Sequence, residues 1–426
     1  MSDSLKTKKN PLLQLTDEEL LGLIQRQTFR YFWEFAHPAC GMARERNHEH
    51  YGDVVTTGGS GFGLMAMVVA AEKKWITTED FITRMNQVMA FLFHCEKYHG
   101  AFSHWYNGNT GKTILFGKKD DGADLVETSF LMMGLLTVRQ YLKKLSDKKT
   151  ILLTDKINAL WLNVEWDWFT RGENVLYWHW RPHKSQINLK IEGFNEALIT
   201  YVMAAASPTH SISKEIYHEG WARGGQMVNG KSFYNTTQPL GPDYGGPLYF
   251  AHYSFLGLNP HQLKDTYADY LQQNIAHATI NYSHCVNNPK NYHGYSNQCW
   301  GLSACDSNKR YKPFHPQKDF GTICPSAAIS SLPYLPKASM AAIRHFYEDM
   351  GKKLWGAYGF YDSLNKTRSW YGRSYLAINQ GPIIVMIENH QTGLLWELFM
   401  SCDEINNGLQ KLGFDQNLTN ALPKIA

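Results

Sequence analysis

Residues 120–145 read DDGADLVETSFLMMGLLTVRQYLKKL, four acids running into a long apolar segment. This pattern predicts a helix from Asp124 to about Leu145, because Asp at an N-cap and Glu three residues later satisfy the free amides of a first turn. Asp124 and Glu127 are enough for that capping role. The further acids Asp120 and Asp121 are therefore candidates for an active site at the start of a core helix.

Similar helical patterns recur along the chain. We expect further helices over residues 17–35, 64–71, 77–98, 155–169, 192–206, 263–278, 338–351 and 378–399. The glycine-rich segment Thr56–Gly63 reads as a loop that leads into the second of them. No βαβ rhythm is visible, so a parallel sheet is not expected.

Between these helices lie three long loops, Ala101–Lys119, Gln226–Tyr249 and Asn288–Ile323, rich in Gly, aromatic, His and Asn residues. Loops of this length usually carry function or are disordered. Many helices without a short repeat suit an all-α helical toroid in which inner and outer helices alternate. No linker divides the chain, so we expect an N-terminal tail over residues 1–16 and one domain over residues 17–426.

Composition excludes several classes of protein. The net charge of the 426 residues is only +4 and the basic residues are scattered, which argues against a nucleic-acid partner. No run of 18 apolar residues suggests membrane insertion. The seven cysteines are odd in number and form no CxxC pair, so neither a disulfide framework nor a zinc site is expected. The first ten residues lack the apolar core of a signal peptide, so the chain is either cytoplasmic or written without its export signal.

Aromatic residues make up 14% of the chain, which suits either a ring-rich core or a sugar cleft. The segment 178–182, WHWRP, is followed by Glu192 and Glu196. If both acids lie on one face of a helix, at i and i+4, their repulsion raises the pKa of one of them, as a general acid requires. Asp362 follows the glycine-aromatic segment 355–361, which is typical of a sugar subsite.

Other catalytic patterns are missing from the sequence. No HExxH zinc motif, phosphate-binding glycine loop or GxSxG nucleophile elbow occurs. We therefore expect neither a metal nor an organic cofactor.

Several blocks of the sequence are similar to the putative-glucoamylase-like family, which includes the bacterial endo-β-1,2-glucanases of glycoside hydrolase family 144. They are YGGPLYFAHYSFLG (244–257), Gly294-Tyr295, CWGLSA (299–304), GTICP (321–325) and SLPYLP (331–336). The resemblance covers about residues 17–412. It implies an (α/α)6 barrel that hydrolyses linear β-1,2-glucan to sophorooligosaccharides with inversion, and a periplasmic or secreted location.

The resemblance also implies roles for particular acids. Glu196 is the expected general acid, and Asp124, Asp120 and Asp362 are candidates for the base. Inversion needs two carboxyl groups about 6.5–9.5 Å apart, which Glu192 and Glu196 alone would not provide. Expected contacts to sugar come from aromatic, basic and polar side chains and from three further acids: Trp105, Tyr106, Trp178, Trp180, Trp300, Trp370, Tyr371, Arg181, Arg373, His104, Asn297, Glu127, Glu192 and Asp362.

The expected partner is a β-glucan and the expected state is a monomer. Rival functions are an exo-acting or transglycosylating β-glucan enzyme on the same scaffold, a polysaccharide lyase, and a carbohydrate-binding protein without activity. A lyase would need a basic cleft for uronates, which the small net charge does not favour. The acids Asp120, Asp124 and Glu196 argue against a purely binding protein.

Overall fold

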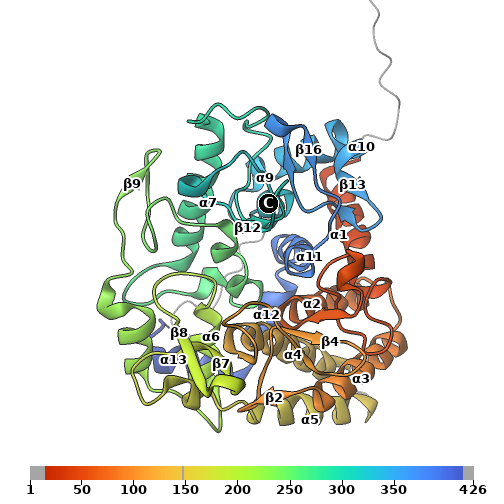
Figure 1. Cartoon of the computed structure of the whole chain (residues 1–426), viewed down its shortest axis with the longest axis vertical. Helices are drawn as coiled ribbons and strands as arrows, with labels where there is room; N and C mark the ends of the chain where they lie inside the picture. The colour runs from red at the N-terminus through yellow and green to blue at the C-terminus, as the bar shows by residue number, and fades with distance from the viewer. Residues whose placement is uncertain (1–14, 146–147, 416–426) are drawn as a thin grey trace, which may run out of the picture.

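The computed structural model describes residues 15–145 and 148–415, and its helices follow one another along the whole of that part (Figure 1). The α-helices are α1 (Asp17–Trp33), α2 (Thr57–Glu72), α3 (Thr78–His94), α4 (Leu125–Leu145), α5 (Lys148–Leu162), α6 (Leu198–Ala206), α7 (Tyr270–Asn287), α8 (Pro325–Ser330), α9 (Pro336–Arg344), α10 (Gly351–Leu354), α11 (Ala377–Gln391), α12 (Leu394–Met400) and α13 (Asp403–Leu412). The short 3₁₀ helices between α6 and α7 include η6 (Leu248–Ala251) and η7 (Ser254–Leu256).

All strands are short and lie in the connections. They are β1 (Val54–Thr56), β2 (Lys97–Tyr98), β3 (Ala101–Phe102), β4 (Trp105–Asn107), β5 (Thr113–Ile114), β6 (Ala123–Asp124), β7 (Tyr177–Arg181), β8 (Gln186–Lys190), β9 (Ser232–Phe233), β10 (Thr236–Thr237), β11 (Ala304–Cys305), β12 (Lys312–Pro313), β13 (Trp355–Gly356), β14 (Gly359–Phe360), β15 (Leu364–Asn365) and β16 (Trp370–Tyr371). The pairs of named strands in the described residues are all antiparallel, as the missing βαβ rhythm predicts.

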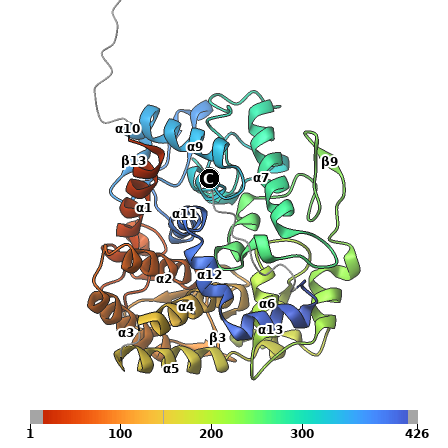
Figure 2. The ribbon, with the colours of Figure 1, turned by 180° about the vertical axis from the view of Figure 1, so that it is seen from behind.

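The helices form the two rings of an (α/α)6 barrel. Going round the inner ring, α2 packs on α4, α4 on α6, α6 on η7, η7 on α11, and α11 on both α8 and α2. The outer ring consists of α1, α3, α5, α13, α7 and α9. Of these, α1 packs on α2, α3 on α5, α5 on α4, α13 on α6 and α9 on α8, while α7 packs on η6. Figures 1 and 2 show α11 nearly end-on among helices from both halves of the chain. The predicted all-α toroid is confirmed.

Burial explains which helices are inner ones. All nine residues of α6, all six of α8 and the run from Leu125 to Leu142 in α4 are buried, whereas α3 buries one face only. A helix that is apolar on all sides belongs inside a protein, and an amphipathic helix belongs at its surface. The buried apolar side chains form one cluster from Leu20 to Phe414. The division into a tail and one domain stays a prediction, and residues 1–14 of that tail lie outside the described residues.

The glycine-rich segment expected as a loop is helical, which corrects the prediction for Thr56–Gly63. α2 begins at Thr57, and its glycines let it approach α4 closely. A Cβ on Gly61 would lie 2.2 Å from the carbonyl oxygen of Phe130, and one on Gly134 would lie 2.2 Å from the carbonyl oxygen of Gly61. Glycine lowers helix propensity, but here the close contact between two inner helices requires it.

Replacing Gly61 by alanine should therefore destabilise the fold, although alanine is the better helix former. We expect Gly61→Ala to lower the free energy of unfolding by about 1–3 kcal/mol, as overpacked cores do, in a urea titration. The matched control is Gly22→Ala in α1, where nothing lies within 4 Å of the added Cβ. That variant should gain about 0.5–1 kcal/mol. Equal effects of the two substitutions would contradict a tight α2–α4 contact.

Several predicted starts and ends of helices are wrong. The helix expected over 155–169 is α5, which begins earlier and ends at Leu162, before a separate 3₁₀ turn at Trp166–Thr170. The helix expected to begin at Leu263 begins at Tyr270, capped by Asp269. The one expected over 378–399 is divided into α11 and α12 at Gly393, whose φ is 74°. Apolar periodicity locates a helix, but local caps and glycines set its ends.

No helix among the described residues combines the length and apolarity that crossing a bilayer requires.

Candidate active site

A cavity of about 690 Å³ lies where the inner helices α2, α4, α6 and α11 begin. Its wall includes Thr56 before α2, Val126 and Glu127 in α4, Glu196 shortly before α6, and Ile378 in α11, together with side chains from the strands and loops above them. Amide groups in the first turn of a helix are free to bind oxygen atoms, and the helix dipole favours negative charge there. The cavity therefore has the setting in which several carboxylates can be held close together.

Asp124 is the fixed centre of the acidic cluster. Its Oδ1 accepts hydrogen bonds from the amides of Val126 (3.0 Å) and Glu127 (2.9 Å), so it caps α4 as the sequence predicts. Its Oδ2 accepts one from Trp178 Nε1 at 3.2 Å and lies 3.1 Å from His104 Nδ1. Burial alone would raise the pKa of Asp124, but hydrogen bonds from His104 and His179 hold it well below its usual range. Asp124 is therefore ionised at neutral pH.

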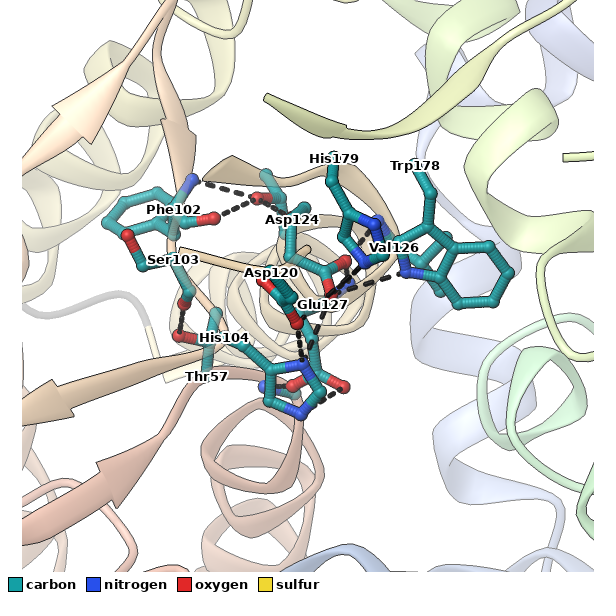
Figure 3. Close-up of polar contacts among 12 residues, drawn as sticks. Thr57, Phe102, Ser103, His104, Asp120, Asp124, Val126, Glu127, Trp178 and His179 are labelled. Atoms are coloured by element: carbon teal, nitrogen blue, oxygen red, sulfur yellow. Dashed lines mark hydrogen bonds and ion pairs between the residues drawn. The ribbon is translucent and has the colours of Figure 1, made fainter. Parts of the chain in front are cut away.

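Strand pairing brings the two histidines to Asp124. β6 and β7 are antiparallel with Asp124 opposite His179, which places these side chains on one face of the sheet. A bridge between Ser103 and Ala123 brings the neighbouring His104 to the same place. Figure 3 shows His104, His179 and Trp178 gathered around the acids.

His104 and His179 carry the positive charge of the cluster. Desolvation opposes the charged form of His104, but Glu127, Asp120 and Asp124 outweigh it and raise its pKa well above the usual value. His104 Nδ1 lies 2.9 Å from Asp120 Oδ2, and burial raises the pKa of Asp120. The pKa of His179 is also raised, since Asp124 and Asp120 outweigh its burial. The cluster thus alternates negative and positive groups.

Glu127 lies between the first turns of α2 and α4. Its Oε2 accepts a hydrogen bond from the amide of Gly58 at 2.6 Å, a contact that a Cβ on Gly58 would obstruct. Its Oε1 lies 3.7 Å from His104 Nε2. Burial, with Asp124 and Asp120 nearby, raises the pKa of Glu127 to about 7, although His104 and Gly58 act in the opposite direction.

Glu196 lies on the adjoining part of the wall, in the connection before α6. The Ser254 hydroxyl donates to the carbonyl oxygen of Glu196 and accepts from the amide of Ile199 at 3.0 Å, which fixes the backbone at the helix start. The carboxyl group is enclosed by protein on most sides. Desolvation, with smaller contributions from Asp124 and Glu127, raises the pKa of Glu196 to about 7. Glu196 and Glu127 are thus two buried carboxyl groups of this cavity whose pKa values are raised to about 7.

Aromatic rings form much of the remaining wall. Phe116 stacks on His104 with the ring centroids 3.8 Å apart and meets Trp105 edge-on at 4.9 Å. Tyr249 and Tyr253 stack on each other at 5.1 Å and line the same cavity, as does Trp178. A space with ring faces and a few converging carboxyl groups suits a sugar.

The structure brings seven of the predicted site residues to this cavity: Asp120, Asp124, Glu127, Glu196, Trp105, Trp178 and His104. It places others in the core. Tyr106 and Trp300 are fully buried, and their polar atoms bond to backbone, Tyr106 to Glu96 and Trp300 to Ala338. Large rings are common in protein cores, so their presence alone does not identify a sugar site.

Asp362 is buried away from the cavity wall. It accepts hydrogen bonds from the amide of Asp306 at 2.6 Å and from Asn379 Nδ2 at 2.7 Å. Burial, with Asp306 beside it, raises the pKa of Asp362 to about 7. Its contacts tie together two loop segments and the start of α11, which is a structural role.

The helical pairing predicted for Glu192 and Glu196 is wrong. α6 begins at Leu198, and Gly193 has a φ of 75°, so residues 192–196 do not form a helical turn. Glu192 is exposed and does not line the cavity, and Glu196 owes the shift of its pKa to burial and the acids of α4 instead.

The remaining predicted contacts lie outside this cavity. Arg181 pairs with Asp121 at 3.1 Å, Trp180 borders a second cavity, and Trp370 and Tyr371 form strand β16. Arg373 and Asn297 are exposed.

Several residues of the cavity had no predicted role. His179 lies within the WHWRP segment, and the strand alternation of that segment was the signal that could have paired it with Asp124. Tyr249 and Tyr253 lie within the 244–257 block. Glu45 and Arg46 bond to each other at 2.6 Å on the cavity wall, and nothing in the nearby sequence marks them.

His104, Asp120 and Asp124 are also the described residues whose ligand atoms lie close enough together, within 4.8 Å, to hold a metal ion. His104 would need a free Nδ1 lone pair to bind one. The three acids raise the pKa of His104, so a metal ion bound here would have to displace a proton from this ring.

The chain is similar in sequence and in fold to known proteins. A family model described as "Putative glucoamylase" matches residues 188–403, and one described as a protein of unknown function (DUF3131) matches residues 24–189. A crystal structure of a putative glucoamylase from Bacteroides uniformis is 49% identical, with a TM-score of 0.93, and the match covers 96% of this chain and 100% of that one.

Two further relatives have more specific names. The endo-β-1,2-glucanase from Chitinophaga pinensis, solved with sophorotriose and glucose, is 48% identical with a TM-score of 0.93, over 95% of this chain and 100% of that chain. The exo β-1,2-glucooligosaccharide sophorohydrolase (non-reducing end) of Parabacteroides distasonis is 43% identical over 434 residues, which is 96% of this chain. This chain spans 60% of the length of that curated relative.

Proposed function

Since this chain belongs to the family described as putative glucoamylases, we propose that it is a glycoside hydrolase that cleaves β-1,2-glucans. The observation that carries the proposal is the position of Glu196. A carboxyl group whose pKa is about 7 shares one cavity with Asp120, Asp124 and Glu127, and glycoside hydrolysis needs a protonated and an ionised carboxyl group on either side of the scissile bond. The named substrates of the two glucan-degrading relatives support the choice of linkage.

Glu196 acts as the general acid in this proposal and donates its proton to the glycosidic oxygen. The base comes from the cluster on α4. Both oxygens of Asp124 are already bonded to amide, indole and imidazole donors, so Asp124 holds the cluster together rather than accepting a further proton. The charged partner of Glu127 Oε1 is His104 Nε2, which is 3.7 Å away. This oxygen is therefore free to activate a water molecule, with Asp120 and His104 beside it.

We further propose endo-acting cleavage to sophorooligosaccharides with inversion at the anomeric carbon. The C. pinensis enzyme supports the endo mode because the match covers the whole of that chain. Exo-acting release of sophorose is the second candidate, and the P. distasonis relative favours it. The monomeric state and the periplasmic or secreted location remain predictions from the family.

The product profile of the purified protein tests the function and the mode together. On linear β-1,2-glucan we expect a mixture of sophorooligosaccharides from the earliest times, α-configured at the new reducing end, and no products from β-1,3-, β-1,4- or α-1,4-glucan. Sophorose as the sole early product would identify the exo mode. A β-configured product would overturn inversion, and inactivity on β-1,2-glucan alongside activity on another glucan would overturn the linkage.

A further inference from the structure

A second cavity of about 730 Å³ borders the β7–β8 hairpin further along from the catalytic wall, and the proposed mechanism does not use it. Its lining comes from two places in the sequence, the turn around Trp168 and the strands β7 and β8. The residues are Asp167, Trp168, Arg171, Gly172, Trp180, Ser185, Gln186 and Ile187. This volume lies within the range of small-molecule sites, about 300–1,000 Å³.

Two indole rings form a corner in this cavity. Trp168 and Trp180 meet at an interplanar angle of 89° with the ring centroids 5.0 Å apart. His99 stacks on Trp168 at 3.5 Å and is itself bonded to Glu165 at 2.8 Å. His99 covers one face of Trp168, and another part of this indole borders the cavity. The ring is thus held in place before any ligand arrives, which lowers the entropy cost of binding.

The rim of the second cavity is polar and carries one acidic and one basic side chain. Asp167 pairs with His210 at 3.1 Å, and the Arg171 guanidinium lies 5.6 Å from the ring centroid of Tyr177. Ser185 and Gln186 are exposed and uncharged. Asp167 and Arg171 have opposite charges, so the lining has no net charge that would favour an acidic or a basic ligand. Ring faces bordered by hydroxyl, amide and oppositely charged groups suit a neutral ligand with apolar faces and many hydroxyls.

The second cavity and the catalytic cavity share the β7–β8 hairpin. Trp178 of β7 and Leu189 of β8 line the catalytic cavity, whereas Trp180 and Ile187 of the same strands line the second one. Residues two apart on a strand are about 6.6 Å apart along it. A polysaccharide chain is long enough to reach both places.

We propose that the second cavity is an accessory glucan-binding site, in which Trp168 and Trp180 stack on pyranose rings of the same polymer that is cleaved next to Trp178. The choice of ligand rests on the proposed function. The site adds affinity for long chains because a second contact on one polymer is made at high effective concentration, and it adds nothing for oligosaccharides that fill only the catalytic cavity.

Trp168→Ala tests the site, because Trp168 lies outside the catalytic cavity. We expect KM for long β-1,2-glucan to rise about tenfold, the size of effect typical of a truncated Trp anchor, with kcat unchanged. On the shortest cleavable sophorooligosaccharide, kcat/KM should stay within about twofold. Gln186→Ala, which changes an exposed side chain, should raise KM for the polymer roughly threefold, as loss of one hydrogen bond does. The matched control is Trp75→Ala, since Trp75 is a half-buried Trp that lines neither cavity.

Binding of the polymer is measured separately, by affinity electrophoresis in gels that contain β-1,2-glucan, with Glu196→Gln as the background so that no ligand is consumed. Loss of retardation in the Trp168→Ala and Gln186→Ala variants, and not in Trp75→Ala, supports the site. Unchanged KM and retardation in both variants would overturn it, and so would an equal loss on short and long substrates. If the wild type cleaves no β-1,2-glucan, the proposed function fails, and the electrophoresis alone then decides the binding site.

Discussion

Glu196→Gln is expected to lower kcat on β-1,2-glucan by about 10²–10⁴-fold, the usual contribution of one positioned proton donor. Glutamine keeps the size of the side chain but has no acidic proton to give to the leaving oxygen. The Ser254 hydroxyl donates to the carbonyl oxygen of Glu196 and accepts from the amide of Ile199. Neither contact uses the Glu196 side chain, so the substitution leaves the start of α6 intact. Release of reducing ends measures the loss, and circular dichroism verifies the fold.

The pH dependence separates a catalytic proton from a structural effect. Glu196 is active when protonated, so wild-type kcat/KM should fall as the pH rises above about 7. The residual activity of Glu196→Gln should lack that dependence. Near-normal turnover of the variant, or an unchanged alkaline limb, would remove Glu196 from the acid role.

The raised pKa of Glu196 also makes the stability of the fold depend on pH. Folding raises the pKa of Glu196 from 4.5 to about 7, so the folded state favours the protonated form. Its contribution to stability is full below pH 4.5, declines as the pH rises towards 7, and is constant above that. Glutamine cannot ionise. Urea titrations should therefore show Glu196→Gln gaining stability relative to the wild type between pH 5 and pH 8.

The acids of the site could be predicted from sequence largely because of where helices begin. Asp124 and Glu127 follow a capping pattern, and the first turns of inner helices meet at one end of the barrel. The segment after the two indoles marks Glu192 and Glu196 together as candidates; Glu196 lines the cavity, whereas the helical pairing of the two is wrong. A sequence cannot show that Gly193 turns the chain, so it also cannot show that the electrostatic neighbours of Glu196 are Asp124 and Glu127.

Aromatic residues were the least predictable part of the site. Trp105 and Trp178 line the catalytic cavity, Trp180 lines the second one, and Trp300 lies in the core. All four have sugar-binding chemistry, and only long-range packing decides where each is placed. The glycines of α2 illustrate the same limit for the fold, because propensity alone assigns them to a loop, whereas the contact with α4 places them in a helix.

Asp124→Asn is expected to impair both activity and stability. An amide oxygen can replace Oδ1 as the cap of α4, but the NH₂ group then faces Trp178 Nε1, His104 and His179, which are all donors. Breaking a buried charge pair costs about 3–5 kcal/mol, because the remaining charges lose their partner. The pKa values of His104 and His179 should fall, since Asp124 is among the groups that raise both. We expect at least about a 10²-fold loss of kcat, from misplacement of Glu127 and His104.

Three measurements check this expectation, and Asp121→Asn is the matched control. Asp121 lies three residues earlier, pairs with Arg181 and does not line the cavity, so its variant should keep kcat within about threefold and lose about 1 kcal/mol or less, as partly exposed ion pairs do. Urea titration at pH 7 gives the stabilities, and NMR titration gives the histidine pKa values.

The pKa of Asp124 is lowered on folding, so its contribution to stability is present above pH 3.8 and is lost as the pH falls towards the folded-state pKa. The gap between wild type and Asp124→Asn should therefore be full at pH 7 and shrink in acid. A variant as stable as Asp121→Asn, with unshifted histidines, would show that Asp124 is not the residue on which the cluster depends.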